Sequence, residues 1–251
     1  MRVIEVSVQP VGDRRDTAQQ APFGSGAIGP GAESSEHHLG SRLRDTLAAR
    51  HAMQAAHQED VRQVEADAMH AARKAGSKQA MIQLTSLLDD SWTMIRRLQY
   101  SSDGIGQILV GTHGVVAMTS LYLDATVHCH GDKLHAEKYD HHDGHSLGEI
   151  HLADQTGRSP SAQLNQAANE LEKSLKSSGI KISVLRVVLF NHPRSRVEES
   201  RRPTVQIFAS PYDLARWLRE LPKILDRGQR KTIEELISGH KHQAPHEPHD
   251  H

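Results

Sequence analysis

Residues 100–126, with the sequence YSSDGIGQILVGTHGVVAMTSLYLDAT, decide the fold of this chain. Two apolar runs, 108–110 and 115–118, are joined by Gly111-Thr112-His113-Gly114. Short β-branched runs bounded by Gly are typical of strands, and a short joint that contains Gly is typical of a hairpin. A third run, 121–127, alternates apolar and polar positions. The stretch therefore predicts three successive strands in the most buried part of the protein.

The residues before this stretch predict a helix and then a strand. Apolar residues at helical spacing favour a helix over residues 78–88, and Trp92 begins a strand that reaches Leu98. Residues 1–9 alternate in the manner of a strand added to a sheet edge. Residues 10–35 are rich in Gly, Ala, Pro, Ser and Gln, so we expect a disordered linker there.

The residues after it predict helices alternating with strands. A cap at Ser159 or Ser161, with Pro160 in the first turn, begins a helix that ends near Ser177-Ser178-Gly179. The predicted elements that follow are a strand at 180–190, a charged loop at 191–203, a strand at 205–208, and helices at 210–222 and 227–238. An antiparallel group followed by strand–helix crossovers predicts an α/β (α+β) fold, in which helices flank a mixed β-sheet.

Residues 36–75 predict a long helical extension. Leu39, Leu43 and Leu47 recur at helical spacing, and smaller apolar residues continue the pattern weakly. Two interpretations remain open: a solvated helix packed along one face, or a homotypic coiled coil through which the chain associates with itself. Gly76 is expected to break or kink the helix, and the folded domain is predicted to span residues 76–238.

Composition excludes several classes of protein. The chain has 251 residues, 37% apolar residues and a net charge of −1, which gives no strong field for wholesale nucleic-acid binding. Cys129 is the single cysteine and excludes an internal disulfide framework. The sequence contains no leader pattern and no run of about 18 apolar residues. We therefore expect a cytoplasmic protein with no membrane partner.

Three segments together resemble the nuclease-related domain (NERD) family of the restriction-endonuclease-like superfamily. They are the hairpin ILVGTHGVVAM at 108–118, the helix SPSAQLNQAANELEKSL at 159–175, and the strand–helix unit FASPYDLARWLRELPKIL at 208–225. The resemblance covers residues 76–238 and places Gln163 at the family's glutamine position. It implies a restriction-endonuclease-like core and metal-assisted phosphodiester hydrolysis, in which acids hold Mg²⁺ and a lysine orients the attacking water.

The chain departs from the family at the positions that carry this chemistry. The family's aspartate-containing triplet falls on Ile105-Gly106-Gln107, and its acid-x-lysine triplet falls on Thr119-Ser120-Leu121. The helical glutamate falls near Ser77. No carboxylate or lysine occupies these positions, so the sequence predicts a pseudoenzyme with no catalytic residues. The weak candidates for relocated ligands are Asp103, Asp124 and Gln163.

Histidines crowd the segment 128–151, which we expect to be a His-rich insert. The alternation of Leu134, Ala136 and Tyr139 permits a hairpin there, whereas Gly131, Gly144 and Gly148 favour loops. His128 and His130 share a face if the segment is a strand, and His141 and His145 lie in a Gly-containing loop. These four residues are candidate ligands for a transition metal such as Zn²⁺. The alternative is a polar, solvated insert. A low-complexity His-rich tail, 239–251, is expected to be disordered.

Basic residues gather in the loop before the last strand: Arg194, Arg196, Arg201 and Arg202. They are either DNA contacts or solvated loop charges. The leading hypothesis is a non-catalytic, nuclease-like scaffold that binds DNA, a protein partner or itself through the N-terminal helix. The alternatives are a His-rich metal-binding protein and an active nuclease with relocated ligands. No cofactor is required by the sequence, and Mg²⁺ or Zn²⁺ are the candidates.

Overall fold

The computed structural model describes residues 1–6, 35–97, 105–139, 145–154 and 156–239. The chain forms two compact units, one made of Met1–Val8 and Gln63–His251 and the other of Gln9–Arg62. Helix α1 (Ser35–Leu87) contributes residues to both units. Across the described part of the chain, no helix combines the length and the apolar composition that a membrane crossing requires.

A six-stranded mixed sheet forms the centre of the larger unit. Its spatial order is β1 (Arg2–Val6), β2 (Trp92–Arg97), β3 (Gln107–Gly111), β4 (Gly114–Leu121), β8 (Val184–Phe190) and β10 (Gln206–Phe208). Strand β3 is antiparallel to both β2 and β4, whereas β1 is parallel to β2, and β8 is parallel to β4 and β10. Every residue of β3 and β4 is buried, as expected for strands covered on both faces.

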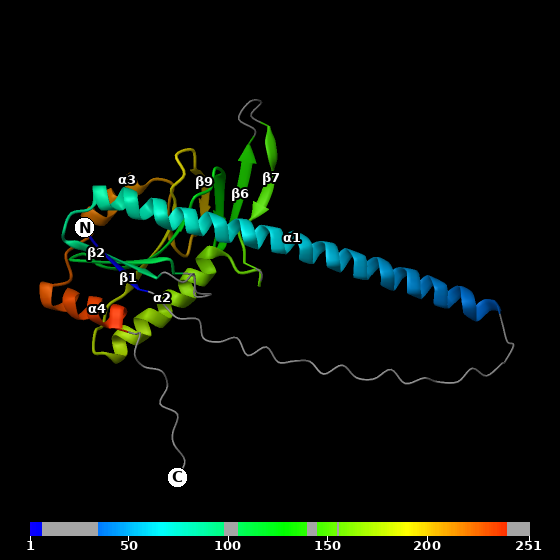
Figure 1. Ribbon diagram of the computed structural model, residues 1–251, viewed down its shortest axis with the longest axis horizontal. Helices are drawn as coiled ribbons and strands as arrows, with labels where there is room; N and C mark the ends of the chain where they lie inside the picture. The colour runs from blue at the N-terminus through cyan, green and yellow to red at the C-terminus, as the bar shows by residue number, and fades with distance from the viewer. Residues whose placement is uncertain (7–34, 98–104, 140–144, 155, 240–251) are drawn as a thin grey trace, which may run out of the picture. The chain divides into compact units, whose positions relative to one another are not determined.

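Helices cover both faces of this sheet (Figure 1). Apolar residues of α1 and α3 (Pro211–Glu220), including Leu84 and Leu218, pack with Met94, Leu109 and Met118. Residues of α2 (Pro160–Ser177) and α4 (Arg227–Gly239) pack against the other face. Because side chains alternate along each strand, neighbouring residues of β4 enter different apolar clusters.

A second, four-stranded sheet was not expected from the sequence. Its order is β7 (Ser146–His151), β6 (Lys133–Tyr139), β5 (Thr126–His130) and β9 (Arg196–Arg201). Val127, Cys129, Leu134 and Ala136 alternate along β5 and β6 into the apolar cluster that contains α2. The intervening side chains face away from this cluster, and several of them are histidines and glutamates.

The predicted mixed sheet flanked by helices is confirmed, but four local expectations are wrong. Helix α1 continues through Gly76, and the loop expected at Gly148 lies within β7, whereas Gly131 does lie in a turn between β5 and β6. The charged loop predicted at 191–203 contains β9. The strand predicted at 121–127 is divided, because β4 ends at Leu121 and β5 begins at Thr126. The predicted linker and the His-rich tail lie outside the described residues, except at their margins.

Candidate functional site

Residues 105–107 and 119–121, the expected counterparts of the family's catalytic triplets, meet helix α1 in a buried polar cluster. Gln107, at the start of β3, donates from Nε2 to the backbone carbonyl oxygen of Ser77 at 2.8 Å. The Oγ of Ser120, on β4, donates to Gln107 Oε1 at 2.8 Å. Each of the three residues is at most 4% exposed. A buried amide that is hydrogen-bonded through both its nitrogen and its oxygen fixes α1 against these strands.

Two further hydrogen bonds reach α1 carbonyl groups, one at Gly76, next to Ser77, and one at Ala72, about one turn earlier. Asn191, which follows β8, donates from Nδ2 to the carbonyl oxygen of Gly76 at 2.8 Å. The backbone N–H of Tyr122 donates to the carbonyl oxygen of Ala72 at 3.0 Å. We call Gln107, Ser120 and Asn191, together with the α1 carbonyl groups of Gly76 and Ser77, the docking cluster.

Gly76 explains how the helix comes so close to the sheet. A Cβ atom built at this position would lie 2.4 Å from the carbonyl oxygen of Ser120. Real Cβ atoms do not approach an oxygen this closely, so any larger residue would push α1 away from β4. The glycine that was expected to end the helix therefore serves as its contact point with the sheet.

The residues expected to correspond to the family's catalytic groups offer no metal ligand of the required kind. Gly106 has no side chain, and Thr119 is 2% exposed. Leu121, at the expected lysine position, is fully buried in the apolar cluster that includes α2. The docking cluster consists of amides, a hydroxyl and backbone carbonyls, and so carries no net charge. Divalent Mg²⁺ in nuclease-like sites depends on carboxylates, which none of these positions supplies.

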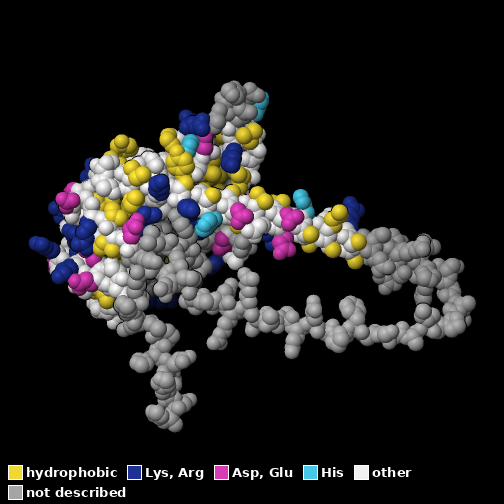
Figure 2. All heavy atoms as spheres, viewed as in Figure 1, with side chains coloured by type: hydrophobic (Ala, Val, Ile, Leu, Met, Phe, Trp, Pro, Cys, Tyr) yellow, Lys and Arg dark blue, Asp and Glu magenta, His cyan; other side chains and the backbone are white. Residues whose placement is uncertain are grey.

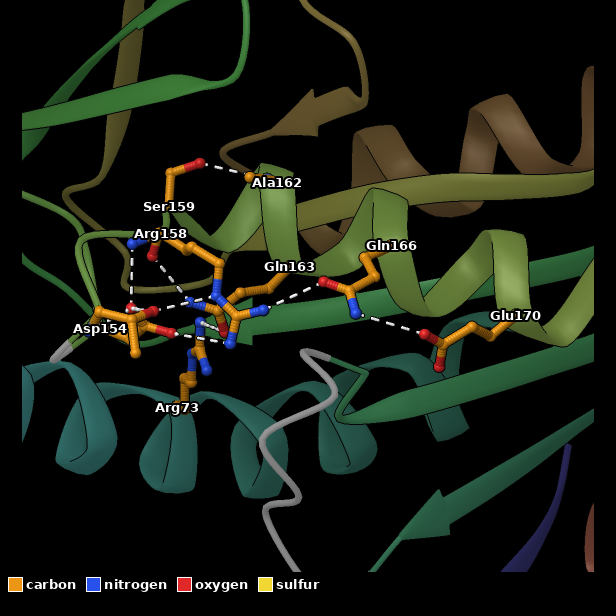
Figure 3. Close-up of polar contacts among 9 residues, drawn as sticks. Arg73, Asp154, Arg158, Ser159, Ala162, Gln163, Gln166 and Glu170 are labelled. Carbon is orange, nitrogen blue, oxygen red and sulfur yellow. Dashed lines mark hydrogen bonds and ion pairs between the residues drawn. The ribbon is translucent and has the colours of Figure 1, made fainter.

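A second polar group surrounds Gln163 at the beginning of α2 (Figure 3). Arg73 of α1 donates from Nη2 to Gln163 Oε1 at 2.8 Å, and Gln163 Nε2 donates to the carbonyl oxygen of Arg158 at 2.8 Å. Burial lowers the pKa of the Arg73 guanidinium, and the charge of Asp154 partly opposes this effect. Arginine nevertheless keeps its charge in proteins. Gln163 therefore links α1 to the start of α2.

Asp154 organises the turn that leads into α2. Its Oδ1 accepts hydrogen bonds from the backbone N–H groups of Thr156 and Arg158 and from the Thr156 hydroxyl, at 2.6–2.9 Å. Burial raises the pKa of the Asp154 carboxyl, but the hydrogen bonds from Thr156 and Arg158 outweigh it, so the net pKa is lowered. Ser159 then caps the helix, accepting from the N–H of Ala162 (Figure 3).

The other candidate catalytic acids lie elsewhere. Asp103 is outside the described residues. Asp124, in the connection between β4 and β5, has Oδ2 2.5 Å from Arg194 Nη2 and Oδ1 3.6 Å from His192 Nδ1. Asp124 is thus one member of an ion pair with a loop arginine that was itself a candidate DNA contact.

The remaining arginines lie along and after β9. Arg196 begins this strand and Arg201 ends it, while Arg202 follows with a φ of 47°. All three side chains are exposed. This arrangement brings Arg196, Arg201 and Arg202 to one edge of the four-stranded sheet, since β9 is its outer strand.

The candidate metal ligands are only partly brought together. His128 lies on the outward face of β5, whereas His130 is exposed at the end of this strand. His145 is exposed before β7, and His141 is outside the described residues. Within the residues that the structure describes, no three His, Cys, Asp or Glu side chains are arranged to hold a metal ion.

Sequence reasoning missed the actual neighbours of His128. They are His135 and Glu137 of β6 and Glu149 of β7, which line one open cavity of about 360 Å³ with His128, Cys129 and His130. The period-two alternation of Val127, Cys129, Leu134 and Ala136 was the signal that could have placed the intervening side chains on one face.

Comparison with known proteins gives no match to any family model, curated protein or solved structure.

Proposed function

We propose that this chain is a non-hydrolytic protein of restriction-endonuclease-like architecture that acts as a binding scaffold. The order of elements supports this proposal: α1, the strands β2, β3 and β4, the helix α2 and then β8 parallel to β4. This is the order that the resemblance to the nuclease-related domain family implies. The observation that carries the proposal is the uncharged docking cluster, in which Gln107 binds the helix and Ser120 binds Gln107.

The chemistry of hydrolysis argues against catalysis at residues 105–107 and 119–121. A phosphodiesterase of this type needs carboxylates to hold a divalent cation, which stabilises charge on the phosphate and activates water. Here the acid-x-lysine segment supplies Thr119 and the fully buried Leu121. The close contact of Gly76 with Ser120 supports the same conclusion, because the helix backbone already lies against this strand.

The surface of α1 favours a protein as the partner. Met53, Val61 and Val64 are 77%, 44% and 69% exposed. At 3.6 residues per turn these three positions fall within an arc of about 80° on the helix. Hydrophobic side chains are visible between charged ones along α1 in Figure 2. An apolar stripe of this kind is a docking surface for another helix, and a second copy of the chain offers the same stripe.

A cleavage assay tests the absence of hydrolysis. Full-length protein is incubated with supercoiled plasmid DNA and Mg²⁺ or Mn²⁺, and nicking is followed on agarose gels. We expect no cleavage above that of a buffer control. Cleavage by the wild-type protein that disappears in Asp103→Asn or Asp124→Asn would overturn the proposal in favour of a nuclease with relocated ligands.

Sedimentation equilibrium tests self-association through α1. The wild-type protein is expected to exceed the mass of 27.8 kDa for one chain, and Met53→Asp/Val64→Asp is expected to sediment as a monomer. The matched control is Ala55→Asp/Gln58→Asp, which adds the same charge at exposed positions away from the stripe and should leave the association unchanged. Monomeric wild-type protein would exclude a second copy as the partner.

DNA binding is a second candidate, favoured by the exposed arginines at β9. Replacing Arg196, Arg201 and Arg202 by Gln should weaken DNA binding in a mobility-shift assay and reduce its dependence on salt, because each phosphate contact releases counterions. The control replaces three exposed cations elsewhere by Gln: Arg216, Lys223 and Lys231. Equal losses in both variants would show that these arginines form no specific interface.

A further inference from the structure

An open cavity of about 570 Å³ lies where helix α4 passes the edge strand β1. Arg2 of β1 pairs in register with Thr93 of β2, so both side chains lie on the face of the sheet that carries Ile4. Ile4 packs against the apolar cluster to which α2 and α4 contribute. The cavity has the size of a typical small-molecule site, and its walls contain none of the residues of the docking cluster.

Cationic side chains from two elements line this cavity. They are Arg2 of β1 and Arg227, Arg230 and Lys231 of α4. Positions 230 and 231 follow Arg227 at spacings of three and four, which place the three side chains on one face of the helix. The side chain of Arg230 is only 17% exposed, so its charge lies within the cavity wall. The strand and the helix thus both direct positive charge at this cavity, which attracts anions.

Glu234 is the buried counter-charge of two of these arginines. Its Oε2 accepts a hydrogen bond from Arg2 Nη2 at 2.9 Å, and its Oε1 lies 3.9 Å from Arg230 Nη2. Among the described residues, the buried Nε of Arg230 and the buried hydroxyl oxygen of Ser238 have no hydrogen-bond partner. One carboxylate therefore compensates two guanidinium groups, and polar groups beside it remain unpaired. A further acceptor in the cavity would complete this arrangement.

The other two carboxylates of the described lining are exposed to solvent. The side chain of Asp90 is fully exposed, and that of Glu235 is 66% exposed, with Oε1 3.7 Å from Lys231 Nζ. Solvent screens exposed charges, and exposed ion pairs of this length are weak. These two carboxylates therefore oppose an anion only weakly. A ligand with two negative charges can replace Glu235 as the partner of Lys231.

We propose that this cavity binds a phosphoryl group, either free as inorganic phosphate or carried by a small polar molecule such as a sugar phosphate. Guanidinium groups bind phosphate oxygens through paired hydrogen bonds, and an ammonium group adds a point charge. Arg2, Arg230 and Lys231 supply these groups. Ile4 is the single apolar side chain among the described residues that line the cavity, so the rest of the ligand meets polar groups such as Thr93. The site does not depend on the proposed scaffold function.

Isothermal titration calorimetry of the full-length protein with inorganic phosphate, ribose 5-phosphate and ribose tests this inference. We expect both phosphate compounds to bind with one equivalent per chain, and ribose not to bind. Tighter binding of ribose 5-phosphate than of phosphate would assign the ligand to a phosphate ester, whereas equal or weaker binding would assign it to the free ion. The inference is overturned if neither phosphate compound binds at millimolar concentration, or if ribose binds as tightly as ribose 5-phosphate.

Substitutions in the lining locate the binding site. Arg227→Gln/Lys231→Gln removes two exposed cations and should weaken the binding of inorganic phosphate by about tenfold or more, because contacts between charged groups are lost. Glu234→Gln removes the competing carboxylate and should strengthen this binding. The matched control, Arg216→Gln/Lys223→Gln, removes the same charge from exposed positions outside the lining and should leave the affinity unchanged. Circular dichroism establishes that each variant is folded. Equal losses of affinity in Arg227→Gln/Lys231→Gln and in the control would overturn the inference.

Discussion

Gln107 Nε2 donates a hydrogen bond of 2.8 Å to the carbonyl oxygen of Ser77, so a neutral side chain on β3 holds helix α1 to the sheet. Ser120 binds the oxygen of the same amide. Both side chains come from segments, 105–107 and 119–121, that the proposed resemblance to the nuclease-related domain family pairs with catalytic triplets. In this chain these segments hold α1 against β3 and β4. This structural role is consistent with the proposed scaffold.

A carboxylate at position 107 should be poorly tolerated at neutral pH. In Gln107→Glu the group that faces the Ser77 carbonyl changes from a donor to an acceptor, in a site with no exposed surface. The pKa of the new carboxyl should rise above its unfolded value of about 4.3, because burial disfavours the charged form. We expect the free energy of unfolding to fall by roughly 2–4 kcal/mol at pH 7.

The pH dependence distinguishes this mechanism from a simple packing defect. When the folded-state pKa of a carboxyl is raised, the free energy of unfolding of the protein falls as the pH increases from the unfolded-state pKa to the folded-state pKa. Urea unfolding at pH 4 and pH 7 should therefore show a smaller defect at pH 4. Gln166→Glu, at a polar surface position, serves as the control. A defect of equal size at both pH values would contradict the expected charge burial.

Gly76→Ala should destabilise the protein although alanine favours helices. The added Cβ would lie 2.4 Å from the Ser120 carbonyl oxygen, so α1 must shift. Overpacking of this kind typically costs about 1–3 kcal/mol, against a gain of about 1 kcal/mol in helix propensity. We expect a net loss in thermal unfolding. The control is Gly239→Ala, whose added Cβ has no atom within 4 Å and should leave the unfolding temperature unchanged. Equal changes in the unfolding temperature of both variants would argue against the close contact of Gly76 with Ser120.

Asp154→Asn should reduce stability in a manner that depends on pH. The pKa of Asp154 is lowered below its usual value of 3.8, so its charge stabilises the folded state above that value. This contribution is lost as pH falls through the folded-state pKa. The difference in the free energy of unfolding between the wild-type protein and Asp154→Asn should be largest at neutral pH and should close as the pH falls through the folded-state pKa, which lies below 3.8. A difference that is constant with pH would refute the role of the charge.

The hairpin of β3 and β4 could be predicted because its information is local. The apolar runs and Gly111-Thr112-His113-Gly114 specify two strands and the turn between them, and both strands are present. The cap of α2 at Ser159 was also recognisable from the residue type and the following proline. Such features depend on a few adjacent residues, so a single sequence contains most of what determines them.

The four-stranded sheet depends on pairing between distant segments. Strand β9 has the sequence RVEESR, in which Val197 is the single apolar residue, and it forms because it pairs with β5. For the same reason, the sequence did not group His128 with Glu137 and Glu149, which line the same cavity in the structure. Four candidate histidines were chosen by sequence proximity, whereas cross-strand register brings together residues from three strands.

The docking cluster could be predicted only in part. The sequence singled out residues 105–107, residues 119–121 and Ser77 separately, and in the structure Gln107, Ser120 and Ser77 meet. Asn191 follows a separate strand, and its bond to Gly76 spans 115 positions. A glycine within a helical pattern predicts a break, because its low helix propensity is evident from the sequence. Its contact with another element is evident only from the tertiary structure.

Titration with Mn²⁺, followed by paramagnetic broadening of backbone amide signals in nuclear magnetic resonance spectra, tests the central claim most directly. If residues 105–107 and 119–121 bind a helix and hold no metal, the amides of Gly106, Gln107 and Thr119 should keep their line widths at Mn²⁺ concentrations that support cleavage by nucleases. Selective broadening of these three amides at low Mn²⁺ would place a cation at the sheet end and contradict the account.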